Sequence, residues 1–222
     1  SLNVVLLRDH GKINDEFYIV TDYYRKGSLE LMISKGSMNY DAKIQMLLSI
    51  AKTLEGVHAM GIIHGDIKPA NFLISDNGTP LISDFYYDLR TTNSSGLPNG
   101  TIEFMPPEQA HGKLLSFQSD IYSLGVMAYL MFTGQSPFSE SASIRELIKD
   151  KMEGNFPDPA QLSNEVSQEL SQFILKSMNP LQENRFKTMK EFSDNIPISS
   201  GNISSNKFEK ISCLRRILNY FK

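Results

Sequence analysis

Residues 62–74 read IIHGDIKPANFLI and place three polar groups, Asp66, Lys68 and Asn71, in one short loop between two apolar runs. A further carboxylate, Asp84, follows in the stretch ISDF. Phosphoryl transfer needs a carboxylate that can accept a proton, a cation, and oxygen ligands for a hard divalent ion. The loop therefore contains the candidate chemistry of this chain.

The elements on either side of the loop are predicted from hydrophobic spacing. Before the loop, apolar residues recur at helical intervals, with Asn39 suited to cap the start of the helix and Gly61 to follow its end. After the loop, two short apolar runs flank the turn sequence of residues 76–78, Asp-Asn-Gly, which predicts a hairpin. We therefore expect the loop to be held between a helix and a hairpin.

Composition limits the class of protein. The chain has 222 residues, of which 41% are hydrophobic and 21% charged, which favours one compact globular domain. Its formal charge of −3 gives no support for a nucleic-acid partner. The lone Cys213 excludes an internal disulfide framework, and the four histidines show no zinc spacing with it. The apolar run of residues 4–7 is too short for a membrane span, so we expect a soluble, cytoplasmic protein without a transmembrane segment.

The remaining chain is predicted to be mainly helical. Near the start, NVVLL (residues 3–7) and EFYIVTDYY (residues 16–24) suggest an antiparallel strand pair joined by the turn-like RDHGKIND. Residues 88–103 have few apolar anchors and are expected to form a long mobile loop. Apolar periodicity predicts later helices over residues 121–132, 144–152 and 166–178.

The end of the chain has a different pattern. The stretch ISSGNISSN after Pro197 is typical of a linker, and residues 207–222 place apolar side chains on one helical face with Lys and Arg around it. A helix docked on its own domain is one interpretation. A helix that contacts a partner or a membrane surface is the other.

Four motifs in order resemble the large lobe of a eukaryotic-type serine/threonine protein kinase over residues 3–197. They are HGDIKPANFLI, ISDFY, GTIEFMPPE and SDIYSLG. The resemblance implies an α+β, protein-kinase-like fold, with a predominantly helical large lobe and a short remnant of the small-lobe β-sheet. It also implies a remnant of the small lobe and the hinge strand over residues 1–24, the large lobe over 25–197, and a linker with a basic amphipathic helix over 198–222.

The resemblance also implies roles for the polar groups. Asp66 would orient a substrate hydroxyl and accept its proton, and Lys68 would neutralise charge on the transferring phosphoryl group. Asn71 and Asp84 would hold Mg²⁺ ions that bridge the phosphates of ATP. Thr101 would bond to Asp66 and Lys68. Its place after Gly100, together with the Lys-Pro pair at 68–69, is similar to serine/threonine kinases, so the implied partners are ATP and a protein substrate with Ser or Thr.

The nucleotide base would lie elsewhere in the sequence. The stretch FYIVTDYYRKGSL resembles the strand and hinge that cradle adenine, with Thr21 in the gatekeeper place and Asp22, Tyr23 and Tyr24 as the hinge. An ordinary edge strand that leads into a turn is the alternative.

Three further matches are architectural. His64 would support the loop by packing and hydrogen bonding, without acting in catalysis. Asp120 would hydrogen-bond the backbone of the loop. Glu108 would pair with Arg185 and so support the stretch GTIEFMPPE, which the resemblance implies is the platform for the substrate.

The sequence departs from the kinase pattern at three places. The given residues contain no glycine-rich phosphate loop, strand lysine or helical glutamate before residue 3, so the sequence is either a fragment of a longer kinase or a product that has lost the cover over the nucleotide. Gly65 stands where many kinases have arginine, and Tyr86 replaces the glycine that usually follows Asp-Phe. These departures support an alternative function, in which a pseudokinase or scaffold module keeps the kinase fold as a protein-binding surface without turnover.

Overall fold

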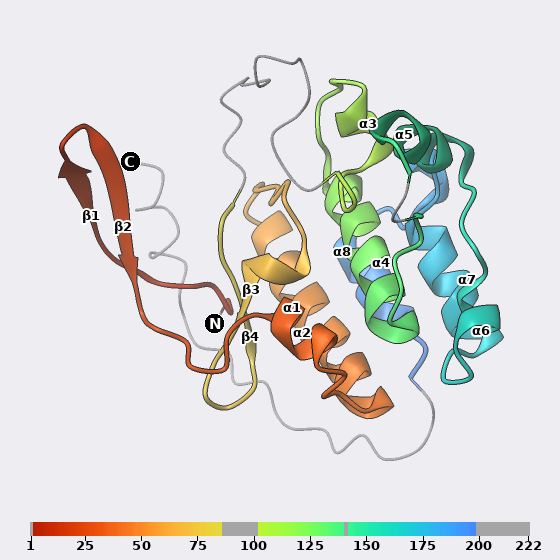
Figure 1. The fold of residues 1–222 in the computed structure, drawn as a ribbon, viewed down its shortest axis with the longest axis horizontal. Coiled ribbons are helices and arrows are strands. Elements are labelled where there is room, and N and C mark those ends of the chain that lie inside the picture. The colour runs from red at the N-terminus through yellow and green to blue at the C-terminus, as the bar shows by residue number, and fades with distance from the viewer. Residues whose placement is uncertain (1, 86–101, 140–141, 199–222) are drawn as a thin grey trace.

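The computed structural model describes residues 2–85, 102–139 and 142–198 (Figure 1). The longest helices are α2 (Tyr40–His58), α4 (Phe117–Thr133), α5 (Ile144–Glu153) and α7 (Gln168–Ser177). Shorter helices are α1 (Leu29–Ser34), α3 (Pro107–Ala110), α6 (Pro159–Leu162) and α8 (Met189–Asp194). The strands are β1 (Leu7–Ile13), β2 (Glu16–Thr21), β3 (Phe72–Ile74) and β4 (Pro80–Ile82). This architecture confirms the predicted α+β class with a predominantly helical lobe.

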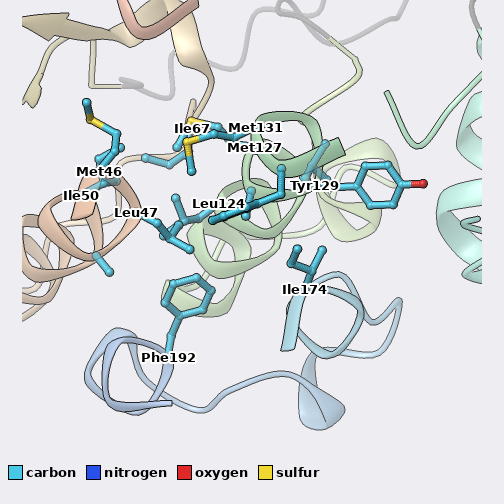
Figure 2. Packing of buried hydrophobic residues seen from close by; sticks show 14 of the residues in the cluster. Met46, Leu47, Ile50, Ile67, Leu124, Met127, Tyr129, Met131, Ile174 and Phe192 are labelled. Atoms are coloured by element: carbon cyan, nitrogen blue, oxygen red, sulfur yellow. The ribbon is translucent and has the colours of Figure 1, made fainter. Parts of the chain in front are cut away.

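The core lies where α2, α4, α7 and α8 meet. Leu47 and Ile50 of α2 are fully buried with Leu124 of α4, Ile174 of α7 and Phe192 of α8 (Figure 2). Apolar residues cover α4 almost all round, so this helix forms the centre of the helical body. The polar loop is thus attached to a rigid support.

Helix boundaries follow local capping. The side chain of Asn39 accepts a hydrogen bond from Ala42 N at 2.9 Å, which confirms its predicted role as the cap of α2. Helix α4 begins at Phe117, four residues before the predicted start at residue 121. The Ser119 hydroxyl accepts from Ser116 N at 2.9 Å and thereby stabilises an earlier first turn. Gly134 ends α4 with a left-handed φ of 72°, as expected for a C-terminal glycine.

The two hairpins differ in how well they were predicted. Strands β3 and β4 pair around the 76–78 turn as expected, with Phe72 opposite Ile82. Residues 3–7 were predicted to pair with residues 16–24, and this is wrong. The strand that pairs with β2 is β1 (Leu7–Ile13), which apart from Leu7 lies inside the expected turn of residues 8–15. The chain turns at Asn14 and Asp15, whose φ values of 50° and 68° are left-handed, a conformation that Asn and Asp tolerate better than most residues.

Residues 3–5 have another partner. Val5 N donates to Ile82 O, and Ile82 N donates to Asn3 O, both at 2.8 Å. The apolar run at the start of the chain therefore extends along β4. The β1–β2 hairpin lies at one edge of the molecule (Figure 1), where Phe17 is 85% exposed and Ile19 61% exposed.

Some expectations fall outside the described residues. They are the part of the predicted 88–103 loop up to residue 101, the linker from residue 199 onward, and the predicted 207–222 helix. Helices α1 and α8 were not predicted. Within the described residues, no helix is long and apolar enough to cross a bilayer.

Candidate functional site

The polar loop, residues 64–71, brings three of the predicted site residues into direct contact. Lys68 Nζ lies 2.8 Å from Asp66 Oδ2, and Asn71 Nδ2 donates to the same oxygen at 2.9 Å. Asn71 Nδ2 also donates to the main-chain carbonyl of Asp66 at 2.8 Å. Pro69 begins a short 3₁₀ turn (Pro69–Asn71) that folds the chain back, which explains how residues five apart can meet.

The three side chains are exposed to different degrees. The side chain of Asp66 is 29% exposed and that of Lys68 20% exposed, whereas Asn71 is buried. Asn71 uses its amide nitrogen toward Asp66, so its amide oxygen is the atom that a cation could use. The partly exposed groups of Asp66 and Lys68 can meet a ligand from solvent. The buried amide of Asn71 holds the Asp66 carboxylate in position.

One buried carboxylate anchors the backbone of the loop. Asp120, in the first turn of α4, accepts from His64 N, Gly65 N and His58 Nε2, each at 2.8 Å. This confirms the predicted bond between Asp120 and the loop backbone. Gly65 has a left-handed φ of 76°, which glycine adopts without the steric cost that a side chain adds.

His64 is a structural residue, as predicted. Its Nδ1 accepts from Asp66 N at 3.2 Å, so the proton lies on Nε2, which donates to Ser83 O at 3.0 Å. The ring packs on Phe85 with centroids 4.6 Å apart. Burial lowers the pKa of His64, which keeps the imidazole neutral. Both nitrogens are engaged, so His64 orients the loop.

Asp84 lies beside the loop because β4 ends there. Ser83 N donates to Asn71 O at 2.9 Å, and Ser83 Oγ lies 3.1 Å from that carbonyl and 2.8 Å from Asp84 Oδ2. Asp84 has a left-handed φ of 55° and an exposed side chain. A carboxylate and an amide oxygen on adjoining segments are the kind of hard oxygen ligands that Mg²⁺ prefers, so this donor set fits such an ion.

The platform, residues 102–110, is held by a buried ion pair. Arg185 donates from Nη1 to Glu108 Oε1 at 2.8 Å and from Nη2 to Glu108 Oε2 at 2.9 Å, which confirms the predicted pair. Ser119 Oγ adds a bond to Oε1 at 2.7 Å. Burial opposes ionisation of Glu108, but the Arg185 guanidinium outweighs it and holds the pKa of that carboxyl below its usual value.

A cleft of about 360 Å³ lies between the polar loop and the platform. Helix α1 and the end of α4 complete its wall. Its lining residues are Glu30, Ile33, Ser34, Lys68, Pro69, Ala70, Glu103, Phe104, Leu130 and Gly134. The cleft is therefore lined by one charged group of the loop, Lys68, and by two platform residues, Glu103 and Phe104.

The predicted hinge residues follow β2. Asp22 forms a two-point ion pair with Arg8, at 2.9 and 2.6 Å, and Tyr23 is 87% exposed. A few residues further on, Gly27 O accepts from Ile74 N at 2.9 Å. The segment after the hinge is thus joined to β3, next to the polar loop. Thr101, the remaining predicted site residue, lies outside the described residues.

Three supporting residues were not predicted from the sequence. His58 shares the Asp120 carboxylate, Ser83 joins Asn71 to Asp84, and Lys151 donates to Glu103 O at 2.5 Å. For His58 the sequence did contain a signal, because a histidine at the end of the helix that precedes the loop lies close to the loop along the chain.

Comparison with known proteins agrees with this geometry. Residues 1–195 match the protein kinase domain. The chain is 34% identical to a probable serine/threonine-protein kinase of Clostridium perfringens, an alignment that covers 85% of this chain and 28% of the relative. It is 31% identical to the serine/threonine-protein kinase PknB of Mycobacterium leprae, covering 83% and 30%, and 27% identical to the serine/threonine-protein kinase PrkC of Bacillus subtilis, covering 87% and 31%.

The chain thus spans about a third of the length of these curated relatives. Its match to the domain extends over most of its own residues, with the polar loop, the Asp120 anchor and the Glu108–Arg185 pair all inside it. The chain belongs to the protein kinase domain family.

Proposed function

We propose that this chain is the catalytic lobe of a serine/threonine protein kinase, which transfers the γ-phosphoryl group of ATP to a protein hydroxyl. The observation that carries the proposal is the contact of Lys68 and Asn71 with one carboxylate oxygen of Asp66. Relatives named as serine/threonine kinases support the choice of substrate class.

The proposed step uses Asp66 and Lys68. As the substrate oxygen forms its bond to the γ-phosphorus, its proton passes to the Asp66 carboxylate, and the bond from the γ-phosphorus to the bridging oxygen breaks to release ADP. Asp66 Oδ2 is already engaged by Lys68 and Asn71, so Oδ1 is the oxygen that would accept this proton. A positioned base contributes roughly 10²- to 10⁴-fold to such a rate. Lys68 would compensate the charge on the equatorial phosphoryl oxygens.

Asn71 and Asp84 are the proposed metal ligands. Their amide and carboxylate oxygens would hold magnesium, which when bound neutralises the phosphates and fixes their orientation. The hydrogen bond from Asn71 to Asp66 joins a metal ligand to the catalytic base, so a movement of either residue would disturb both metal binding and proton transfer.

The nucleotide and the chain divisions are further parts of the proposal. Main-chain groups of Asp22, Tyr23 and Tyr24, with Thr21 behind them, would read the adenine, and Thr101 would complete the loop by bonding to Asp66 and Lys68. Residues 1–24 would form the remnant of the small lobe, residues 25–197 the large lobe and residues 198–222 a linker and basic helix. Cytoplasmic ATP and the presence of a single cysteine, Cys213, suit an intracellular location.

Two measurements test the proposal. Saturating ATP with magnesium, at about 100 times the dissociation constant, should stabilise the chain by about 2.7 kcal/mol and raise Tm by roughly 5–10 °C, and Asp84→Asn should remove the shift. Phosphate transfer from radiolabelled ATP to a serine-containing protein should fall by about 10²-fold or more in Asp66→Asn.

Asp76→Asn is the matched control, because Asp76 is an exposed aspartate in the β3–β4 turn. It should leave both readouts unchanged. A chain that neither shifts with ATP nor transfers phosphate would contradict the kinase proposal and favour a scaffold that retains the kinase fold.

A further inference from the structure

Lys151, in the last turn of α5, is an unusual residue for a buried position. It is fully buried, and its Nζ lies 4.0 Å from the ring centroid of Phe138 and 5.5 Å from that of Tyr122. Lysine is almost never fully buried unless its charge is paired. In the described part of the chain, the Lys151 ammonium is met by a main-chain carbonyl, Glu103 O at 2.5 Å, in place of a carboxylate.

This hydrogen bond ends on the platform next to the cleft. Glu103 and Phe104 line the cleft together with Lys68 and Pro69. Pro106 and Pro107 lack a main-chain donor, and within the described residues Met105 N reaches Ile102 O at 3.3 Å. Lys151 therefore supplies a tertiary restraint on the wall of the cleft.

The burial of the Lys151 amino group costs desolvation free energy, and packing alone does not account for a lysine at this position. A methionine of similar length would fill the same space without desolvating an ammonium group, and apolar replacements of buried charges are often neutral or stabilising. The group that methionine would lack is the donor to Glu103 O. The feature specific to lysine at this position is thus its bond to the platform.

Lys151 also joins the second anchor of the platform. Arg185, which holds Glu108, lies 4.8 Å from the centroid of the same Tyr122 ring. The lysine that bonds to Glu103 O and the arginine that bonds to Glu108 therefore both lie against the ring of Tyr122.

We propose that Lys151 is a positioning residue for the protein substrate, which acts by holding the Glu103 wall of the cleft beside Lys68. The inference rests on the proposed kinase function. It predicts an effect on substrate capture and little effect on phosphoryl transfer, because Lys151 interacts with Glu103, Phe138 and Tyr122, which lie outside the polar loop.

The test compares Lys151→Met with Lys149→Met, which removes an exposed lysine two residues away on the same helix. Amide hydrogen exchange should be about tenfold faster at residues 102–105 in Lys151→Met, the effect of losing one hydrogen bond, and unchanged in α2. The KM for a protein substrate should rise about tenfold with kcat within twofold. Lys149→Met should match the wild type in both.

Each outcome has a definite meaning. Unchanged exchange at residues 102–105, or a fall in kcat with constant KM, overturns the inference. If Lys151→Met does not fold, Lys151→Gln, whose shorter side chain stops before the carbonyl, is measured in its place. A wild-type chain without transferase activity overturns the kinase function and the substrate role with it, whereas hydrogen exchange still reports separately whether Lys151 holds the platform.

Discussion

The polar loop and the platform are each held by one buried carboxylate, but the two carboxylates have different partners. Asp120 bonds to two main-chain N–H groups of the loop and to His58. Glu108 bonds to the Arg185 guanidinium and to Ser119. The first arrangement gives two main-chain N–H groups of the loop their acceptor, and the second joins two distant segments through charge.

The difference shows which anchor is replaceable. An ion pair can be exchanged for apolar side chains of similar volume, because desolvation offsets much of its attraction. The bonds that such an exchange would not replace are those from Arg185 to the carbonyls of Gln118, Asn179 and Pro180. Buried N–H groups still need an acceptor, so no apolar residue can replace Asp120. We expect the platform to tolerate a double substitution and the loop to require its carboxylate.

The largest expected effect comes from breaking the platform pair on one side. Arg185→Met leaves Glu108 buried without its cation and should lower the free energy of unfolding by about 3–5 kcal/mol, measured by urea denaturation. The double variant Arg185→Met, Glu108→Met should recover at least half of this loss. A double variant as unstable as the single one would show that the pair is not replaceable.

The second expected effect is a pH dependence of the free energy of unfolding, which arises from Lys151. Burial lowers the pKa of Lys151 to about 7, so between that value and the ordinary 10.5 the unfolded chain binds the extra proton. Stability should therefore rise with pH, by about 2–3 kcal/mol between pH 7 and 9, from a shift of about 1.4 kcal/mol per pKa unit. Lys151→Met should remove this rise, while Lys149→Met should keep it.

The groups that face Lys151 do not reverse this sign. Glu103 favours the charged lysine but is outweighed by burial. Tyr122 stays neutral because burial raises its pKa, and Arg185 and Glu108 lie beyond its ring as a pair. Equal slopes of stability against pH in the wild type and Lys151→Met would contradict the prediction.

A smaller effect is expected at the loop anchor. Asp120→Asn keeps one acceptor oxygen but turns an NH₂ group toward the loop, which should cost about 1–3 kcal/mol. The amides of His64 and Gly65 should then exchange faster than those of the platform. If both regions respond equally, the two anchors are one cooperative unit and the comparison fails.

The smallest effect is expected at the surface. Lys43 Nζ lies 2.9 Å from Glu165 Oε2, and the side chain is 16% exposed in Lys43 and 53% exposed in Glu165, so the carboxylate of the pair meets solvent. Lys43→Met should change the free energy of unfolding by less than about 1 kcal/mol, since solvent screens such pairs. A loss as large as that of Arg185→Met would show that burial does not distinguish the anchors.

Elements with strong local signals were predicted well. The helix capped by Asn39 and the hairpin around residues 76–78 depend on neighbours in the chain, and both have the expected form. The first hairpin was misplaced because its polar strand β1 lacks apolar alternation and its turn is the less distinctive Asn14-Asp15 pair. Short helices such as α1 and α8 are stabilised mainly by packing, which no periodicity over six residues can reveal.

The sequence by itself determined the composition of the polar loop, because motif order and spacing specify which groups stand near one another along the chain. It also indicated Asp120 and the Glu108–Arg185 pair through the kinase resemblance. Only the tertiary structure decided that His58 shares Asp120 and that Lys151 is buried against the platform. The physical reason is that burial and charge environment depend on neighbours contributed by helices far apart in sequence, and no local pattern records them.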